Sequence, residues 1–305
     1  MEKVLIAAPI STRFKNFLQS NFYELIYIDD VHSYVLENII GIITSNKLHL
    51  NEETLRKYSS LKWIGRLGSG MEIIDTAYCD KHHIAYFSSP QGIANAVAEH
   101  SVGMLLSLLH NIHRAFQEIK QRQWMREENR GIELARLTVG IIGYGHTGSA
   151  FAKKLKAFTP HILAYDKYKS GFSDEIIQEV SLQKLMQEAD VLSFHVPLNE
   201  ETKHYYDETF MNQMAKAHIL MNVSRGAVIP TTTVLKGLES KKILGACIDV
   251  LEEEKNIKQF LKHEYPLQQL LQHNVILTPH IAGYTHDAIE KMCQELEAQI
   301  SQLPM

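Results

Sequence analysis

The stretch Leu137-Thr138-Val139-Gly140-Ile141-Ile142-Gly143-Tyr144-Gly145-His146-Thr147-Gly148 places an apolar strand directly before the pattern G-x-G-x-x-G, and apolar residues at helical spacing follow it. In a strand–turn–helix unit, Gly143 permits the tight turn and Gly145 lets a pyrophosphate approach the backbone, while Gly148 lets the helix pack closely on the strand. The helix start at His146 and Thr147 offers unpaired N–H groups to phosphates. The pattern predicts a dinucleotide-binding unit, against the alternative of a glycine-rich turn needed for packing alone.

An acidic residue follows where this interpretation requires one. The strand expected at 162–165 ends at Asp166, 18 residues after Gly148. A carboxylate there accepts hydrogen bonds from the ribose hydroxyls and repels a 2′-phosphate, which predicts NAD as the cofactor. A solvated aspartate at a strand end is the plain alternative, and Lys167 and Lys169 supply cations that could meet a phosphate.

Strand-like runs alternate with helical patterns along the whole chain, which indicates an α/β fold. We predict two Rossmann-like domains with doubly wound parallel sheets. The first domain has apolar runs at 3–7, 24–28, 39–43 and 63–67. The second has six, at 137–142, 162–165, 191–195, 219–223, 246–250 and 275–277.

Two long helical patterns set the domain boundaries. The first, at 95–123, is suited to bridging two domains or packing in a dimer. The second, at 284–302, is expected to return to the first domain. We therefore predict a substrate domain of residues 1–94 plus 282–305 and an NAD-binding domain of residues 95–281.

Composition excludes several classes of function. A net charge of −4 without long runs of Lys or Arg gives no electrostatic basis for binding nucleic acid or an anionic membrane. The N-terminus lacks the pattern of a signal peptide, and the apolar stretch 102–109 is too short to span a bilayer. Three scattered cysteines suggest free thiols, so we expect a cytoplasmic protein. No histidine pair has partners at metal spacing, so no metal is expected.

Three chemically suitable side chains follow strands of the second domain. Arg225 follows the strand at 219–223, Glu254 lies past 246–250, and His280 follows 275–277. Reduction of a 2-keto acid requires a cation for the carboxylate, a proton donor for the carbonyl oxygen and a partner for that donor. Each residue alone also fits a solvated turn or an acidic loop, so spacing leaves both interpretations open.

The chain resembles the D-isomer-specific 2-hydroxyacid dehydrogenases, a family that includes D-lactate, D-glycerate and D-3-phosphoglycerate dehydrogenases. The resemblance covers nearly the whole sequence and follows the order of several independent motifs. The matching segments are 65–75, Ala96-Val97-Ala98-Glu99-His100, 143–148, His195-Val196-Pro197-Leu198, 222–226, 246–250 and 278–283.

The resemblance assigns roles to individual residues. It implies that Arg225, Glu254 and His280 are catalytic and that Asp249 faces the nicotinamide carboxamide. It also implies that the backbone of Ser69, Gly70 and Met71 cradles the substrate carboxylate, with Arg66 nearby, and that the protein is a homodimer. This sequence departs from the family pattern at Glu254-Lys255, Ile93, Arg136-Leu137 and Thr159-Pro160, which weakens any inference about the substrate.

These observations predict an NAD-dependent oxidoreductase that transfers a hydride between nicotinamide and a small 2-keto or 2-hydroxy acid. Closure of the two domains is expected to exclude water from the reaction. One alternative is a D-3-phosphoglycerate dehydrogenase without a regulatory domain, with Arg66 or the cluster Lys120, Arg122 and Arg126 binding the phosphate. The other is an NAD-sensing, corepressor-like binding protein on the same fold.

Overall fold

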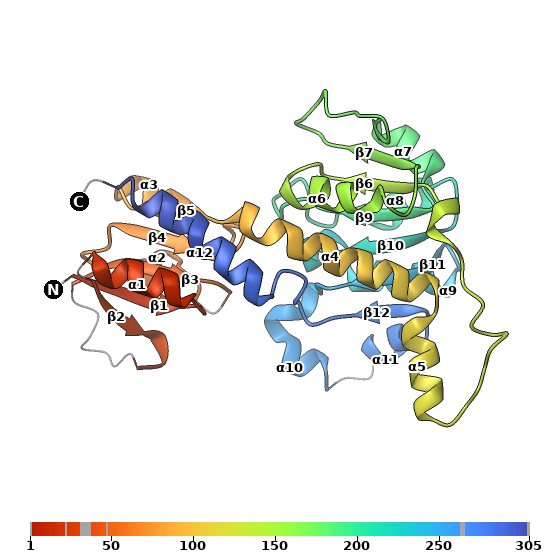
Figure 1. Cartoon of the computed structure of the whole chain (residues 1–305), viewed down its shortest axis with the longest axis horizontal. Helices are drawn as coiled ribbons and strands as arrows, with labels where there is room; N and C mark the ends of the chain where they lie inside the picture. Colours follow the sequence, from red (N-terminus) through yellow and green to blue (C-terminus); the bar gives the residue numbers. More distant parts are fainter. Residues whose placement is uncertain (1, 22, 31–37, 47, 263–265, 304–305) are drawn as a thin grey trace. The chain divides into compact units, whose positions relative to one another are not determined.

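The computed structural model describes residues 2–21, 23–30, 38–46, 48–262 and 266–303 (Figure 1). The chain divides into two compact units. The first unit consists of Met1–Ala96 with Gly283–Met305, and the second consists of Val97–Ala282. Each unit contains one parallel β-sheet with helices, so the predicted α/β fold with two parallel sheets is confirmed.

The first unit has a five-stranded sheet in the order β2-β1-β3-β4-β5. Its strands are β1 (Lys3–Ala7), β2 (Glu24–Tyr27), β3 (Ile39–Thr44), β4 (Trp63–Arg66) and β5 (Ala85–Ser88). The strand order reverses between β1 and β3, and ligands of open α/β sheets bind at the carboxyl ends of strands near such a point. The sequence patterns did not predict β5, a four-residue strand that is only half-buried.

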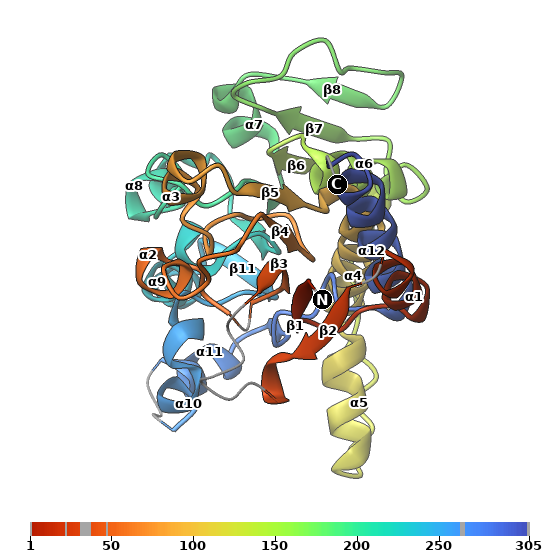
Figure 2. The same cartoon turned by 90° about the vertical axis from the view of Figure 1, so that its left-hand side faces the viewer.

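Four α-helices lie wholly within the described part of the first unit, and one of them, α12, comes from the C-terminal segment of the sequence. They are α1 (Thr12–Ser20), α2 (Glu52–Leu55), α3 (Thr76–Lys81) and α12 (His286–Ile300). Helix α12 packs beside α1 and against β4 and β5 (Figure 2). Its buried face, which includes Met292, Leu296 and Ile300, joins the same apolar core as Trp63. The predicted return of the C-terminal helix to the first domain is therefore confirmed.

The second unit has a seven-stranded sheet in the order β12-β11-β10-β9-β6-β7-β8 (Figure 1). Its strands are β6 (Val139–Ile142), β7 (Ile162–Tyr165), β8 (Ile177–Glu179), β9 (Val191–Phe194), β10 (His218–Asn222), β11 (Ile243–Ile248) and β12 (Val275–Leu277). The chain leaves β6 first toward β7 and β8 and then returns to β9, so the switch point lies between β6 and β9. The sequence patterns did not predict β8, which has three residues.

The remaining helices are α4 (Pro90–Leu109), α5 (Ile112–Lys120), α6 (His146–Leu155), α7 (Leu182–Glu188), α8 (Glu208–Gln213), α9 (Thr231–Glu239), α10 (Ile257–Phe260) and α11 (Leu267–Leu271). The prediction of a single helix at 95–123 was wrong. This segment belongs to two helices, α4 and α5, because Asn111 between them adopts a left-handed backbone with φ 54°. The division between the two units falls within α4, between Ala96 and Val97.

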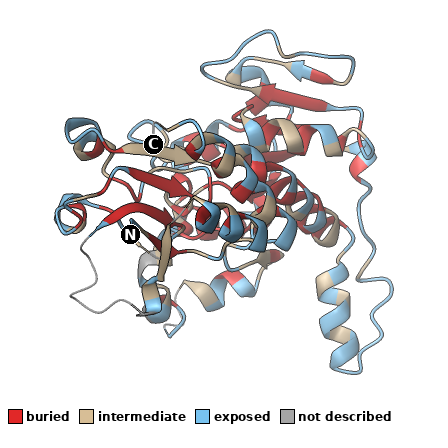
Figure 3. Cartoon of the chain, turned by 60° about the vertical axis from the view of Figure 1, so that its left-hand side comes forward, coloured by how far each residue is buried: buried red, intermediate tan, exposed pale blue. Residues whose placement is uncertain are grey.

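Helix α4 is long and apolar enough to cross a membrane, and in the described part of the chain it is the one helix of that kind. However, 61% of this stretch is buried within the protein, as is usual for a core helix. Figure 3 shows strands buried in both sheets, whereas no residue of α5 is buried. Helix α5 therefore exposes the apolar side chains of Ile112, Phe116 and Ile119.

Candidate active site

The glycine loop follows β6 at the switch point of the second sheet, and two of its glycines are required by packing. Gly143 has φ 93°, and a Cβ there would lie 2.6 Å from the carbonyl oxygen of His195. A Cβ on Gly148 would lie 2.0 Å from the carbonyl oxygen of Gly143. Side chains at either position would push the loop away from the strands.

Gly145 differs from the other two glycines. Its φ of −79° suits any residue, and an added Cβ would meet nothing within 4 Å. Gly145 precedes α6 without a side-chain cap, and among the described residues the N–H groups of His146, Thr147 and Gly148 have no acceptor. Open space beside unpaired donors at a helix start suits a phosphate, so this loop fits the pyrophosphate of a dinucleotide.

Asp166 directly follows β7 and is hydrogen-bonded to the glycine loop. Its Oδ2 accepts the N–H of Tyr144 at 2.7 Å, and its Oδ1 accepts the N–H groups of Tyr168 and Lys169. The two neighbouring lysines have different partners. Lys167 Nζ donates to Glu201 Oε2 at 2.7 Å, and Lys169 Nζ donates to Tyr144 O at 3.4 Å. Asp166 thus braces the turn of the glycine loop, a contact that spacing alone does not predict.

His195 lies beneath the glycine loop, and its environment is that of a packing residue. The ring lies beside that of Phe151 in a tilted arrangement, with centroids 5.2 Å apart, and Nε2 lies 2.9 Å from Ser193 Oγ. Burial lowers the pKa of His195 from 6.5 to about 3, so the ring is neutral. Its Nδ1 has no partner in the described part of the chain.

Arg225 stands on a turn that Asn222 organises at the end of β10. The Asn222 Nδ2 donates to the carbonyl oxygen of Arg225 at 3.0 Å, and its Oδ1 accepts from the backbone and hydroxyl of Ser224. A Cβ on the next residue, Gly226, would lie 2.0 Å from the backbone of Leu251. This glycine therefore lets the Arg225 turn pack against the segment that leads to Glu254.

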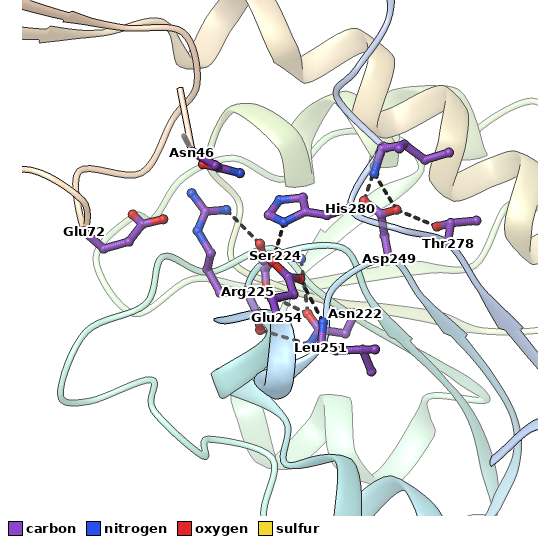
Figure 4. Close-up of polar contacts among 12 residues, drawn as sticks. Asn46, Glu72, Asn222, Ser224, Arg225, Asp249, Leu251, Glu254, Thr278 and His280 are labelled. Atoms are coloured by element: carbon purple, nitrogen blue, oxygen red, sulfur yellow. Dashed lines mark hydrogen bonds and ion pairs between the residues drawn. The ribbon is translucent and has the colours of Figure 1, made fainter. Parts of the chain in front are cut away.

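The three consecutive glutamates after β11 have three different partners. Glu252 Oε1 lies 2.6 Å from His204 Nε2, and Glu253 Oε2 accepts the Thr231 hydroxyl at 2.7 Å. Glu254 faces His280 instead, with Oε2 2.7 Å from Nδ1, while its Oε1 accepts the N–H of Leu251 (Figure 4). The helical turn Glu252–Asn256 points each carboxylate in its own direction.

His280 follows β12 in a left-handed conformation, with φ 56°. Its N–H donates to the backbone oxygens of Asp249 and Thr278. Because Nδ1 is engaged with Glu254, the other ring nitrogen is left for a substrate, and Nε2 has no partner among the described residues. Strands β10, β11 and β12 are neighbours, so Arg225, Glu254 and His280 emerge from adjacent strand ends (Figure 4).

Asp249 is buried, with 2% of its surface exposed, and its carboxylate is occupied by the chain itself. It accepts the Thr278 hydroxyl at 2.5 Å and the N–H groups of Ile281 and Ala282 at 2.9 and 2.8 Å. The structure thus shows Asp249 holding the turn that follows β12. A contact with nicotinamide remains a prediction.

In the first unit, the loop after β4 has donors suited to an anion. Among the described residues, the N–H groups of Ser69, Gly70 and Met71 have no acceptor. Arg66 is 3% exposed and donates to Ser45 O and to Asn46 Oδ1. The structure therefore shows Arg66 bracing a neighbouring loop, while successive N–H groups offer the anion nest.

Comparison with known proteins decides the family. Residues 102–282 match the D-isomer specific 2-hydroxyacid dehydrogenase, NAD binding domain. The chain belongs to the D-isomer specific 2-hydroxyacid dehydrogenase family. The family was predicted correctly, and residues 102–282 form the family's NAD(P)-binding domain.

Individual relatives within the family have different substrates. A glyoxylate reductase of Thermofilum pendens is 33% identical, over 80% of this chain and 72% of that protein. A D-3-phosphoglycerate dehydrogenase of Bacillus subtilis is 28% identical over 99% of this chain, which spans 57% of the Bacillus protein. The crystal structure of D-lactate dehydrogenase from Aquifex aeolicus, complexed with NAD and lactic acid, has a TM-score of 0.83 and 28% identity, covering 98% of this chain and 94% of that one.

Sequence reasoning missed residues that build the site through backbone contacts. Asn222 shapes the Arg225 turn, and Gly226 allows it to pack on Leu251. Thr278 lies between Asp249 and His100, with Oγ1 3.1 Å from His100 Nε2. The available signal was the presence of polar residues at strand ends. In the described residues, no group of three potential ligands could hold a metal ion.

Proposed function

We propose that the chain is an NAD-dependent dehydrogenase that interconverts a small 2-keto acid and its 2-hydroxy acid. The observation that carries this proposal is the 2.7 Å contact between His280 Nδ1 and Glu254 Oε2, beside the Arg225 turn. A histidine paired with a carboxylate through one nitrogen is prepared to transfer a proton through the other.

The residues of the second unit have separate tasks in this reaction. His280 donates a proton from Nε2 to the carbonyl oxygen, and Glu254 fixes the orientation of the ring through Nδ1. Arg225 binds the substrate carboxylate and polarises the carbonyl. A bound nicotinamide supplies the hydride for reduction. The loop Gly143–Gly148 binds the pyrophosphate, and Asp166 favours NAD over NADP.

The division of the chain into two compact units supports separate sites for substrate binding and cofactor binding. We assign substrate binding to residues 1–94 with 282–305 and cofactor binding to residues 95–281. Unpaired N–H groups of Ser69, Gly70 and Met71 support carboxylate binding by the first unit. The buried guanidinium of Arg66 acts by keeping that region in place.

A turnover assay tests the proposal and identifies the substrate. NADH oxidation is followed with glyoxylate, pyruvate, hydroxypyruvate and 3-phosphohydroxypyruvate in turn. Turnover of one or more unphosphorylated acids supports the proposal. A strong preference for 3-phosphohydroxypyruvate favours the phosphoglycerate alternative. NADH binding without turnover of any of the four favours a cofactor-sensing binding protein.

We further propose a homodimer built on the second unit. Support comes from α5, where Ile112, Phe116 and Ile119 are 56%, 60% and 50% exposed along one short helix. Apolar side chains clustered on an exposed helix commonly mark an interface between proteins. A cytoplasmic location is also proposed, since Cys79, Cys247 and Cys293 are free thiols, as a reducing compartment favours.

A further inference from the structure

A chain of hydrogen bonds links α4 to the turn that carries His280. His100 lies on α4, Asp249 follows β11, and Thr278 follows β12. The Thr278 hydroxyl lies 2.5 Å from Asp249 Oδ1 and 3.1 Å from His100 Nε2. His100 Nε2 also lies 3.7 Å from Asp249 Oδ1. All three residues belong to the second unit.

The chemistry of these groups sets the direction of the hydrogen bonds. A carboxylate accepts and cannot donate, so the one hydroxyl proton of Thr278 goes to Asp249. The lone pairs of the hydroxyl are then left for His100, whose Nε2 must carry the hydrogen. The hydrogen bonds are therefore donated from the imidazole of His100 to Thr278 and from Thr278 to the buried carboxylate of Asp249.

The carboxylate of Asp249 in turn fixes the backbone around His280. Its two oxygens accept the N–H groups of Ile281 and Ala282, while its carbonyl oxygen accepts the N–H of His280. His280 itself has φ 56°, a conformation that residues with a Cβ rarely adopt without support. The position of its imidazole thus depends on where Asp249 is held.

We propose that Thr278 and His100 are positioning residues for the acid/base histidine: by holding the Asp249 carboxylate, they keep the turn at His280 in its left-handed conformation. This inference rests on the proposed function, because it gives the turn a catalytic purpose. His100 and Thr278 act through Asp249 and the backbone, and they transfer no proton to the substrate.

Two substitutions at Thr278 test the tether, which is the hydrogen-bonded link from His100 through Thr278 to Asp249. Thr278→Val keeps the shape and removes the hydroxyl, whereas Thr278→Ser restores it. In Thr278→Val, hydrogen exchange of the Ile281 and Ala282 amides should accelerate about tenfold, since a hydrogen bond to a charged group is lost. kcat for keto-acid reduction should fall about tenfold, while KM for NADH stays within about twofold. Thr278→Ser should return both amide exchange and kcat toward wild type.

Thr159→Val is the matched control, because Thr159 is another buried threonine of the second unit. Its hydroxyl donates to Leu137 O, just before β6, near the amino-terminal ends of the strands, whereas the candidate active site lies at their carboxyl ends. This variant should lower the melting temperature without changing exchange at 281 and 282 or the ratio of kcat to KM. A Thr278→Val protein that exchanges these amides as slowly as wild type overturns the tether.

A companion pair of substitutions tests His100. His100→Gln keeps an N–H donor and should retain most of kcat, whereas His100→Leu should behave like Thr278→Val. Equal kcat in His100→Leu and wild type overturns its role. If the wild-type protein turns over no keto acid, the proposed function fails, and amide exchange still decides whether the tether exists. If the Ile281 and Ala282 amides exchange faster in Thr278→Val but kcat equals that of wild type, the positioning role is overturned.

Discussion

His280 Nδ1 lies 2.7 Å from Glu254 Oε2, although Glu252 and Glu253 stand directly before that glutamate in the chain. The other two carboxylates bind His204 and Thr231. The acidic run is therefore not one diffuse patch of charge, because each carboxylate has a separate neighbour. This arrangement allows single substitutions to separate the proposed catalytic carboxylate, Glu254, from the two others.

Replacing His280 tests the proton donor. His280→Gln keeps a similar size but cannot transfer a proton, so kcat for keto-acid reduction should fall by about 10²–10⁴-fold. The affinity for NADH should change little, because His280 is assigned to the substrate. Steady-state kinetics and NADH fluorescence titration provide the two measurements. The control is His204→Gln, which alters the exposed pair with Glu252 and should retain its kcat.

Replacing Glu254 tests the orientation of the same imidazole. In Glu254→Gln, the ring keeps a hydrogen-bond acceptor of similar size but loses its carboxylate partner, and a hydrogen bond to a charged group is worth about 1.5–3 kcal/mol. The kcat for keto-acid reduction should therefore fall about tenfold or more, while KM for NADH changes little. The measurement is steady-state kinetics for both proteins. Glu253→Gln, which disturbs the contact with Thr231, should keep the wild-type kcat.

Much of this site was predictable because strand ends and glycine patterns are local signals. The strand–turn–helix motif at Gly143–Gly148 correctly predicted a glycine turn between β6 and α6, and order along the chain placed Arg225, Glu254 and His280 after three neighbouring strands. Assigning roles to the last three depended on the family resemblance, since an arginine in a turn and an acidic loop are common.

Other parts of the molecule could not be predicted from pattern. Periodicity carried the predicted first long helix through Asn111, because Leu108, Ile112 and Phe116 keep helical spacing on both sides of it. Asparagine adopts a left-handed backbone more readily than most residues, but the pattern does not show that it does so here. Likewise, the bond from Asp166 to the N–H of Tyr144 joins positions 22 residues apart. The partner of each glutamate depends on the direction of one short helical turn.

The cofactor preference can be tested at Asp166. Wild type should prefer NADH, because a 2′-phosphate beside this carboxylate is repelled. Asp166→Ser and Asp166→Asn should both shift the ratio of kcat/KM for NADH and NADPH toward NADPH by at least about tenfold. The serine variant should also bind both cofactors more weakly, since it no longer braces Tyr144. Lys167→Met serves as a control, because Lys167 is paired with Glu201.

The dimer can be tested on α5. Light scattering at micromolar concentration should report about twice the 34.9 kDa mass of one chain. Phe116→Glu places a charge on the exposed apolar face and should shift the mass toward the monomer. Leu244→Glu changes an equally exposed residue elsewhere and should leave the mass unchanged. A monomeric wild-type protein would contradict the proposed dimer.

The second unit should lose stability in mild acid because two of its histidines are buried and neutral. Burial lowers the pKa of His195 from 6.5 to about 3. Burial is also the main cause that lowers the pKa of His218 to about 4, assisted by Lys242 and opposed by a bond to Lys216 O. Unfolding exposes both rings and lets them bind protons, so acid favours the unfolded chain.

The stabilisation from these rings is complete above pH 6.5, the unfolded value, and is lost progressively as the pH falls toward 4. Each ring should remove about 1.4 kcal/mol of unfolding free energy per pH unit in that window. Urea titrations at pH 7, 6 and 5 measure the slope. His218→Gln can still bond Tyr206 and should remove about half of it, whereas His204→Gln, at an exposed ring, should change little. Equal slopes in wild type and His218→Gln would show that His218 already binds its proton in the folded protein.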